Sequence, residues 1–193
     1  MNSNDELVNY LKDRGYIETS KVEEAFRSVN RGDFVDSPYA YADRALSIGE
    51  DATISAPHMV AKNTELLEVE KDSRVLEIGS GSGYQLAILS ELADEAVGVE
   101  IEEELVEKSR RNLEDYDAEV LHGSGLDPVK GVFDRILYSC AVENFSAAKD
   151  YLADNGIILA PVIEADRQLL KKYRNGETTE HVPVRFVEFK EKT

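Results

Sequence analysis

The sequence predicts an α/β fold: a doubly wound, mainly parallel sheet of seven strands, closed by a C-terminal antiparallel hairpin and preceded by helices. Two observations predict the parallel part. Strand-like runs alternate with helical stretches from Arg74 onward, and the motif VLEIGSGSGY (75–84) places three glycines between a strand and a helix. A third observation predicts the hairpin, because an Asn175-Gly176 turn separates two strand-like runs.

The N-terminal part is expected to consist of helices and a loop. Residues 1–33 are interpreted as two helices, and Ser20 with Glu23 matches a capping box at the second. An apolar stripe follows this box: Val22, Ala25, Phe26 and Val29. Residues 34–57 are expected to form an irregular loop, since proline and glycine interrupt them. A third helix is predicted from Ala56-Pro57 to Leu67, because proline suits a first helical turn.

The remainder of the chain carries the sheet. Strands of parallel type are predicted at 74–78, 95–100, 118–121, 134–139 and 156–161. Helices are predicted near 83–93, 103–113 and 146–153. The segments QLLKKYR (168–174) and HVPVRFVEF (181–189) would complete the hairpin at the sheet edge. We expect a single domain over residues 1–193, with 1–70 forming the helical part and 71–193 the sheet.

Composition limits the function classes. The chain has 193 residues, 42% of them hydrophobic, and no apolar run approaches the roughly 18 residues of a membrane span. The acidic N-terminus lacks the apolar segment of a secretory signal, and Cys140 is the only cysteine, so we expect a cytoplasmic protein without an internal disulfide. The net charge is −17, and the sequence contains no stripe of basic residues that could neutralise the phosphates of a nucleic acid. Such a charge is typical of protein surfaces adapted to high salt. We expect a monomer without membrane or nucleic-acid partners, and no metal site.

The glycine-rich turn predicts a nucleotide cofactor. A dinucleotide fingerprint would need a glycine where Tyr84 stands. Instead, Glu77 precedes the glycines, and a carboxylate there would repel a pyrophosphate but suit the sulfonium and ammonium groups of S-adenosylmethionine. Glu100, at the end of the next predicted strand, could accept hydrogen bonds from both ribose hydroxyls. We therefore expect S-adenosylmethionine, with S-adenosylhomocysteine as product; the alternative is a glycine-rich turn with incidental acids.

The methyl acceptor decides which other groups the site needs. An amine requires a base, whereas a carboxylate is already ionised at pH 7, its pKa being about 4. The sequence offers no compelling base, since His122 and His181 are expected on the surface or in the core. In SIGEDATISAPHMVA (47–61), Ser55 either caps the following helix or is a functional hydroxyl. Cys140 is interpreted as a small core residue rather than a nucleophile.

Four segments resemble the protein-L-isoaspartate(D-aspartate) O-methyltransferase family. They are YADRALSIGEDATISAPHMVA (41–61), VLEIGSGSGY (75–84), FDRILYS (133–139) and PVRFV (183–187). The resemblance implies a Rossmann-like class I methyltransferase sheet with an extra antiparallel C-terminal strand. It also implies methyl transfer from S-adenosylmethionine to the free carboxylate of L-isoaspartyl residues in damaged proteins and peptides, which initiates their repair.

The resemblance assigns roles to individual residues. Ser55 would be the catalytic hydroxyl. The substrate would contact Ile54, Ser55, Ala56 and His58. The cofactor would contact Thr53, Ile54, Glu77, Gly79, Ser80, Gly81, Gly83, Glu100, Ile101, Ser124, Gly125 and Gln168. Residues 71–193 would then be the cofactor-binding part of one methyltransferase domain.

Three segments depart from the family pattern at loops that are expected to face ligands. Ser124 stands where the family usually has the aspartate of Gly-Asp-Gly, Val142-Glu143 replace a small proline-bearing stretch, and Glu164 and Asp166 replace a glycine-rich loop. Two other functions therefore stay open. One is a methyltransferase acting on a different carboxylate, a specific partner protein or RNA; the other is a cofactor-binding protein without repair activity.

Overall fold

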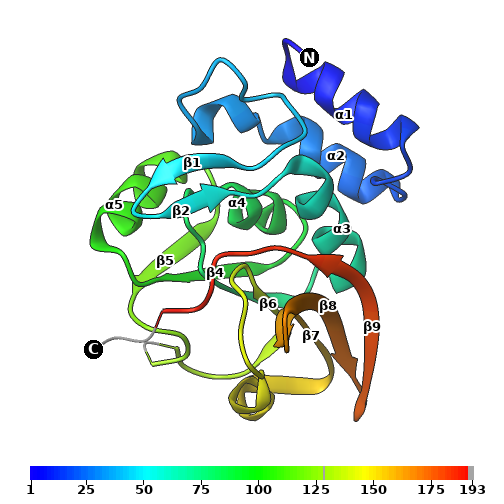
Figure 1. The fold of residues 1–193 in the computed structure, drawn as a ribbon, viewed down its shortest axis with the longest axis vertical. Helices are drawn as coiled ribbons and strands as arrows, with labels where there is room; N and C mark the ends of the chain where they lie inside the picture. Colours follow the sequence, from blue (N-terminus) through cyan, green and yellow to red (C-terminus); the bar gives the residue numbers. More distant parts are fainter. Residues whose placement is uncertain (128, 191–193) are drawn as a thin grey trace.

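A mixed sheet forms the centre of the structure, a computed structural model that describes residues 1–127 and 129–190 (Figure 1). Its seven strands lie in the order β5-β4-β3-β6-β7-β8-β9. They are β3 (Arg74–Ile78), β4 (Glu95–Glu100), β5 (Ala118–His122), β6 (Phe133–Tyr138), β7 (Leu152–Glu164), β8 (Arg167–Arg174) and β9 (Glu177–Val184). Strands β3 to β7 pair in parallel, and β8 pairs antiparallel with both β7 and β9. The predicted doubly wound sheet with a closing hairpin is confirmed.

Helices cover one face of this sheet more fully than the other. The helices α3 (Pro57–Leu67), α4 (Tyr84–Ser90) and α5 (Glu103–Asn112) pack on the face that includes Val75 and Ala96. On the opposite face the 3-10 helix η2 (Ser146–Tyr151) packs near Leu76. The helix predicted near 146–153 is present as this 3-10 helix, and it ends two residues earlier because β7 already begins at Leu152.

The N-terminal segment adds an outer layer. It consists of α1 (Asn4–Asp13), α2 (Ser20–Ser28) and the 3-10 helix η1 (Arg31–Phe34). Their apolar side chains share one core cluster with Tyr84 and Leu105. The predicted capping box is wrong: Thr19 is the N-cap residue of α2, and its hydroxyl donates to Glu65 of α3 (3.0 Å) instead of capping the helix. No helix within the described residues is long and apolar enough to cross a membrane.

The segment expected to be an irregular loop contains a β-hairpin. Strands β1 (Leu46–Gly49) and β2 (Ala52–Ile54) pair antiparallel. Glu50 and Asp51 join them with φ of 51° and 55°, the left-handed region that two-residue hairpin turns require. That region is usually filled by glycine or asparagine. Glu-Asp is not a typical sequence for a hairpin turn. The residue pattern of this segment therefore did not indicate that a hairpin forms here.

The chain leaves the sheet after β9. The second strand of the terminal hairpin was predicted at 181–189, but β9 ends at Val184. Residues 185–190, here called the C-terminal strap, then cross the carboxyl ends of the strands (Figure 1, red). Two backbone hydrogen bonds hold the strap beside Ala141: Ala141 N–H donates to Val187 (2.8 Å), and Phe189 N–H donates to Ala141 (2.8 Å). This crossing closes one side of the site described next.

Candidate active site

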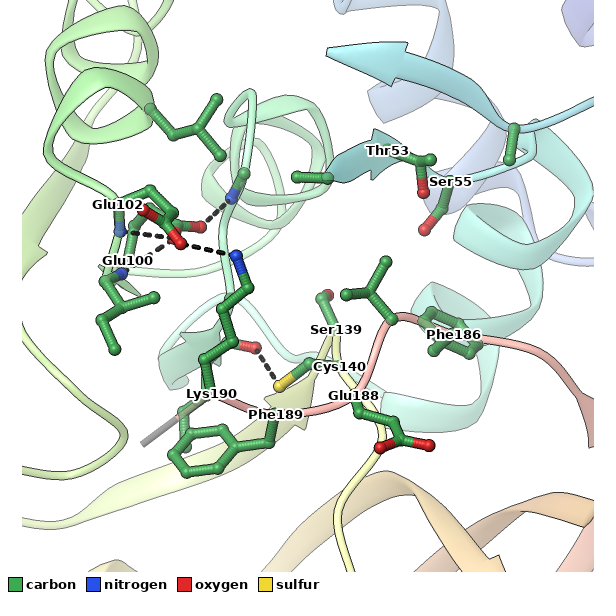
Figure 2. Close-up of a pocket in the computed structure, with 18 of the residues that line it drawn as sticks. Thr53, Ser55, Glu100, Glu102, Ser139, Cys140, Phe186, Glu188, Phe189 and Lys190 are labelled. Carbon is green, nitrogen blue, oxygen red and sulfur yellow. Dashed lines mark hydrogen bonds and ion pairs between the residues drawn. The ribbon is translucent and has the colours of Figure 1, made fainter. Parts of the chain in front are cut away.

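A cavity of about 510 Å³ lies at the carboxyl ends of the parallel strands (Figure 2). The strand order reverses at this point, since β3 has β4 on one side and β6 on the other. Such switch points are the usual ligand sites of open α/β sheets. The cavity walls come from the β1–β2 hairpin, the glycine turn after β3, the end of β4, the turn after β6 and the C-terminal strap.

The glycine turn forms the floor of the cavity next to β3. Gly79 and Gly81 line it with φ of 84° and 54°, a backbone conformation that other residues rarely adopt. A Cβ atom on Gly81 would lie 3.3 Å from Cδ1 of Ile48 in β1. Gly83 also has a positive φ, but it faces Leu113 rather than the cavity. The turn thus leaves backbone exposed where a ligand could approach closely.

Glu100 joins the glycine turn to the start of α5. Its side chain is buried (6% exposed) and lines the cavity. Oε2 accepts a hydrogen bond from Gly81 N–H (2.8 Å), while Oε1 accepts from Ile101 N–H (2.8 Å) and Glu102 N–H (3.1 Å). A carboxylate can accept about four hydrogen bonds. Glu100 therefore keeps capacity for a ligand hydroxyl on Oε2 while it fixes two backbone segments.

A second carboxyl group lies behind the cavity wall. Glu77 is 1% exposed, and burial raises its pKa to about 8 against the opposing effect of the Ser139 hydroxyl, which donates to Oε1 (2.5 Å). The other oxygen, Oε2, has no hydrogen-bond partner among the described residues. Ser139 lines the cavity, whereas Glu77 does not. With its pKa raised to about 8, this carboxyl group is mostly protonated at pH 7, and it does not face the cavity.

The opposite wall carries hydroxyl groups. Thr53 and Ser55 point from the hairpin side into the cavity, as Figure 2 shows. Ser55 does not cap α3, because the N-cap residue is Ala56 and no side chain caps that helix. The helix-capping interpretation of Ser55 is therefore wrong, and its hydroxyl is available to a ligand.

A histidine–aspartate pair lies beside these hydroxyls. Oδ1 of Asp43 lies 2.8 Å from Nδ1 of His58 and accepts the backbone N–H of the same histidine (2.9 Å). The Tyr16 ring packs on the imidazole at a centroid distance of 5.3 Å. His58 lines the cavity. With Nδ1 held by a carboxylate, Nε2 is the ring nitrogen left for a ligand.

Arg31 holds the segment that carries Ser55. Its side chain is completely buried, and burial lowers the pKa of its guanidinium. The guanidinium donates to the carbonyl oxygens of Ala40, Arg44 (3.2 Å) and Ser55 (2.9 Å). Burying a cation is costly unless its hydrogen bonds are satisfied. Three carbonyl groups accept from its two terminal nitrogens, while Nε has no hydrogen-bond partner among the described residues, and the cation in turn fixes the position of the Ser55 backbone.

Most of the site residues expected from the sequence meet in the cavity. Those that line it are Thr53, Ser55, Ala56, His58, Gly79, Gly81, Glu100, Ile101 and Gly125. Those that do not are Ile54, Glu77, Ser80, Gly83, Ser124 and Gln168. Ile54 instead belongs to the hydrophobic core, and the side-chain amide of Gln168 bonds to the backbone of Phe186 in the strap.

The residues that depart from the family pattern do not line the main cavity. Ser124, Val142 and Glu143 line a neighbouring cavity that shares Gly125, Glu188 and Phe189 with the main one. Val142 forms a backbone bridge with Val162. Glu164 and Asp166 lie at the β7–β8 turn, where Glu164 pairs with Lys171. Neither Glu164 nor Asp166 lines either of these two cavities.

Several lining residues were missed by sequence reasoning. They include Ser139, Cys140 and the residues of the strap. The strap could have been found by counting strand pairs outward from the Asn175-Gly176 turn. Gln168, near the start of β8 at Arg167, pairs with Val184, so the residues after Val184 extend past the end of β8. Cys140 lies partly in the core, and burial raises the pKa of its thiol to about 12. A thiol with that pKa is not a nucleophile at neutral pH, in agreement with the interpretation as a core residue.

Comparisons with known proteins agree with this geometry. The family model described as Protein-L-isoaspartate(D-aspartate) O-methyltransferase (PCMT) matches residues 2–193. A protein-L-isoaspartate O-methyltransferase of Vibrio atlanticus is 41% identical over 180 residues, 89% of this chain and 86% of that protein. The enzyme of that name from Pyrobaculum islandicum is 36% identical over 197 residues, 95% of each chain.

Solved structures agree as well. A Plasmodium falciparum protein, described as a beta-aspartate methyltransferase (PCMT) in complex with S-adenosyl-L-homocysteine, superposes with a TM-score of 0.91 and 27% identity over 100% of both chains. A further protein-L-isoaspartate O-methyltransferase structure has a TM-score of 0.86 at 24% identity, and the match covers 96% of this chain and 65% of that one. The second match concerns the fold alone.

Proposed function

Because the chain belongs to the protein-L-isoaspartate(D-aspartate) O-methyltransferase family, we propose that the cavity at the strand ends binds both S-adenosylmethionine and an isoaspartyl carboxylate. The protein is an S-adenosylmethionine-dependent carboxyl methyltransferase that acts on L-isoaspartyl residues of damaged proteins. The observation that carries the proposal is that one cavity contains the glycine turn with Glu100 on one side and the Ser55 hydroxyl on the other.

The cofactor half of the cavity fits S-adenosylmethionine, which supplies an electrophilic methyl group when bound. Gly79 and Gly81 line the cavity with a backbone conformation that other residues rarely adopt. Glu100 has a free acceptor site for a ribose hydroxyl, and Ile101 and Gly125 line the space beside it.

The acceptor half fits a carboxylate. Ser55 would donate a hydrogen bond that orients the carboxylate, and Arg31 keeps the Ser55 backbone in place. His58 would present Nε2 to the same group, because Asp43 holds Nδ1. The acceptor is already ionised at pH 7, so it needs orientation and exclusion of water rather than a base. The strap, which lines one side of the cavity, would contribute to that exclusion.

Finer properties are also proposed. We propose that the chain acts as a single-domain monomer in a cytoplasm of high salt, without nucleic-acid partners. The net charge of −17 supports the last two points, because phosphate backbones would be repelled and salt would screen the self-repulsion. One core cluster shared by the N-terminal helices, α4 and α5 supports a single domain.

The test is methylation of a matched peptide pair. Each peptide, one with L-isoaspartate and one with L-aspartate at the same position, is incubated with methyl-labelled S-adenosylmethionine at high salt. Base-labile label on the isoaspartyl peptide alone is expected. Label on neither peptide, with S-adenosylhomocysteine still bound in calorimetry, would favour another acceptor or a cofactor-binding protein.

The pH dependence tests the acceptor chemistry. The value of kcat/KM for the isoaspartyl peptide should be nearly constant from about pH 6 to 8, because the acceptor carboxylate is ionised throughout this range. A steep rise with a midpoint near 6.5, where histidine ordinarily titrates, would instead make His58 a base and would refute the carboxylate-acceptor mechanism.

A further inference from the structure

Gln168 forms an unusual contact with the strap. It lies at the start of β8, where its backbone pairs with Val184, the last residue of β9. The β7–β8 turn comes immediately before Arg167, so β8 has no further backbone to pair with Phe186. The Gln168 side chain takes that place: Nε2 donates to Phe186 O (3.1 Å), and Oε1 accepts Phe186 N–H (2.6 Å). One amide group thus extends the hydrogen bonding to Phe186, two residues beyond the last backbone pair.

This contact holds a particular part of the strap. Figure 2 shows Phe186 at the end of the cavity near Ser55, whereas Lys190 lies at the other end beside Glu102. Lys190 is held there by an ion pair with Glu102 (2.6 Å). Between them, the backbone of Ala141 bonds to Val187 and Phe189. The strap therefore has separate attachments at its acceptor end and at its cofactor end.

We propose that Gln168 is a positioning residue for the methyl acceptor: by holding Phe186, its amide fixes the wall of the cavity that faces Ser55. This inference rests on the proposed function, because it needs that end of the cavity to bind the isoaspartyl residue. It differs from the role that the resemblance implies, which is contact with the cofactor. The geometry separates the two roles, since the Gln168 side chain does not line the cavity and its amide is engaged by Phe186.

The test uses two substitutions and a control on the same strand. Gln168→Met keeps the length of the side chain but removes both hydrogen bonds, and Gln168→Asn keeps the amide but shortens its reach by one methylene. Arg174→Gln is the control, because it removes an exposed ion pair with Glu68 at the far end of β8. KM for the isoaspartyl peptide, kcat and the Kd for S-adenosylhomocysteine are measured for each, together with the melting temperature.

Both Gln168 variants should raise KM for the peptide by about tenfold, while the Kd for S-adenosylhomocysteine stays within about twofold of the wild type. The control should change neither quantity. An unchanged KM in a folded variant would overturn the proposal, and so would an equal loss of peptide and cofactor binding. If Gln168→Met does not fold, Gln168→Asn decides alone, since it is the milder change. A wild type that is inactive on the isoaspartyl peptide would refute the proposed function, and an active wild type with unaffected variants would refute this inference only.

Discussion

Substitution of Glu100 tests the cofactor site most directly. Its carboxylate accepts three backbone N–H groups, from Gly81, Ile101 and Glu102, and it has one acceptor site left toward the cavity. Glu100→Ala removes all of these interactions at once. Glu100→Gln keeps the shape and can keep the two bonds on Oε1, but it turns an NH₂ group toward the Gly81 N–H and the cavity.

The magnitudes follow from these contacts. A hydrogen bond to a charged group contributes about 1.5–3 kcal/mol. Glu100→Gln should therefore lower the free energy of unfolding of the ligand-free protein by about that amount, through the lost Gly81 contact, and Glu100→Ala should lower it further. Loss of the ligand hydroxyl contact should weaken S-adenosylmethionine binding by about 1–3 kcal/mol, which is roughly 5- to 150-fold in Kd.

The assay pairs calorimetry with thermal unfolding. Binding of S-adenosylhomocysteine is measured for the wild type and both variants, and the ligand-free melting temperatures are measured on the same preparations. Lower stability with unchanged affinity would show that Glu100 is only a structural link between the glycine turn and α5. Unchanged stability and unchanged affinity in Glu100→Ala would refute the geometry itself.

Two further substitutions and a scan of salt concentration test other features of the protein. Ser55→Ala should lower kcat/KM for an isoaspartyl peptide by about tenfold while the melting temperature stays close to that of the wild type, because Ser55 caps no helix; a stability loss with full turnover would contradict this. Glu77 has a pKa raised from 4.5 to about 8, so the folded protein binds more protons than the unfolded chain between these values. The free energy of unfolding of the ligand-free wild type, relative to that of Glu77→Gln, should therefore fall as pH rises from about 4.5 to 8 and should level off above pH 8. If urea unfolding gives the same difference between the two proteins at every pH, the raised pKa of Glu77 is refuted. With a net charge of −17, the melting temperature should rise with added KCl below about 1 M, and a flat or falling curve in a scan of salt concentration would argue against adaptation to high salt.

The meeting of the glycine turn with Glu100 could be predicted because each of the two signals lies within a few residues of the chain. In a parallel sheet the carboxyl ends of neighbouring strands meet at one edge, so a glycine turn after one strand and an acid at the end of the next must lie close together. Gly79, Gly81 and Glu100 meet in this way. The register of β3 with β4 places Ile78 beside Val99, and Glu100 follows directly.

The sequence alone thus determined the alternation of strands and helices and the glycine turn, since both appear as patterns of residues close together in the chain. Only the tertiary structure decided what faces them. The strap reaches the cavity because β8 is too short to pair with Phe186, and Arg31 reaches Ser55 across 24 positions of the sequence. Asp43 and His58 are 15 positions apart and meet only through the packing of the loop on α3. Such contacts depend on where separate elements pack against one another, and residue spacing along one chain carries no signal for that.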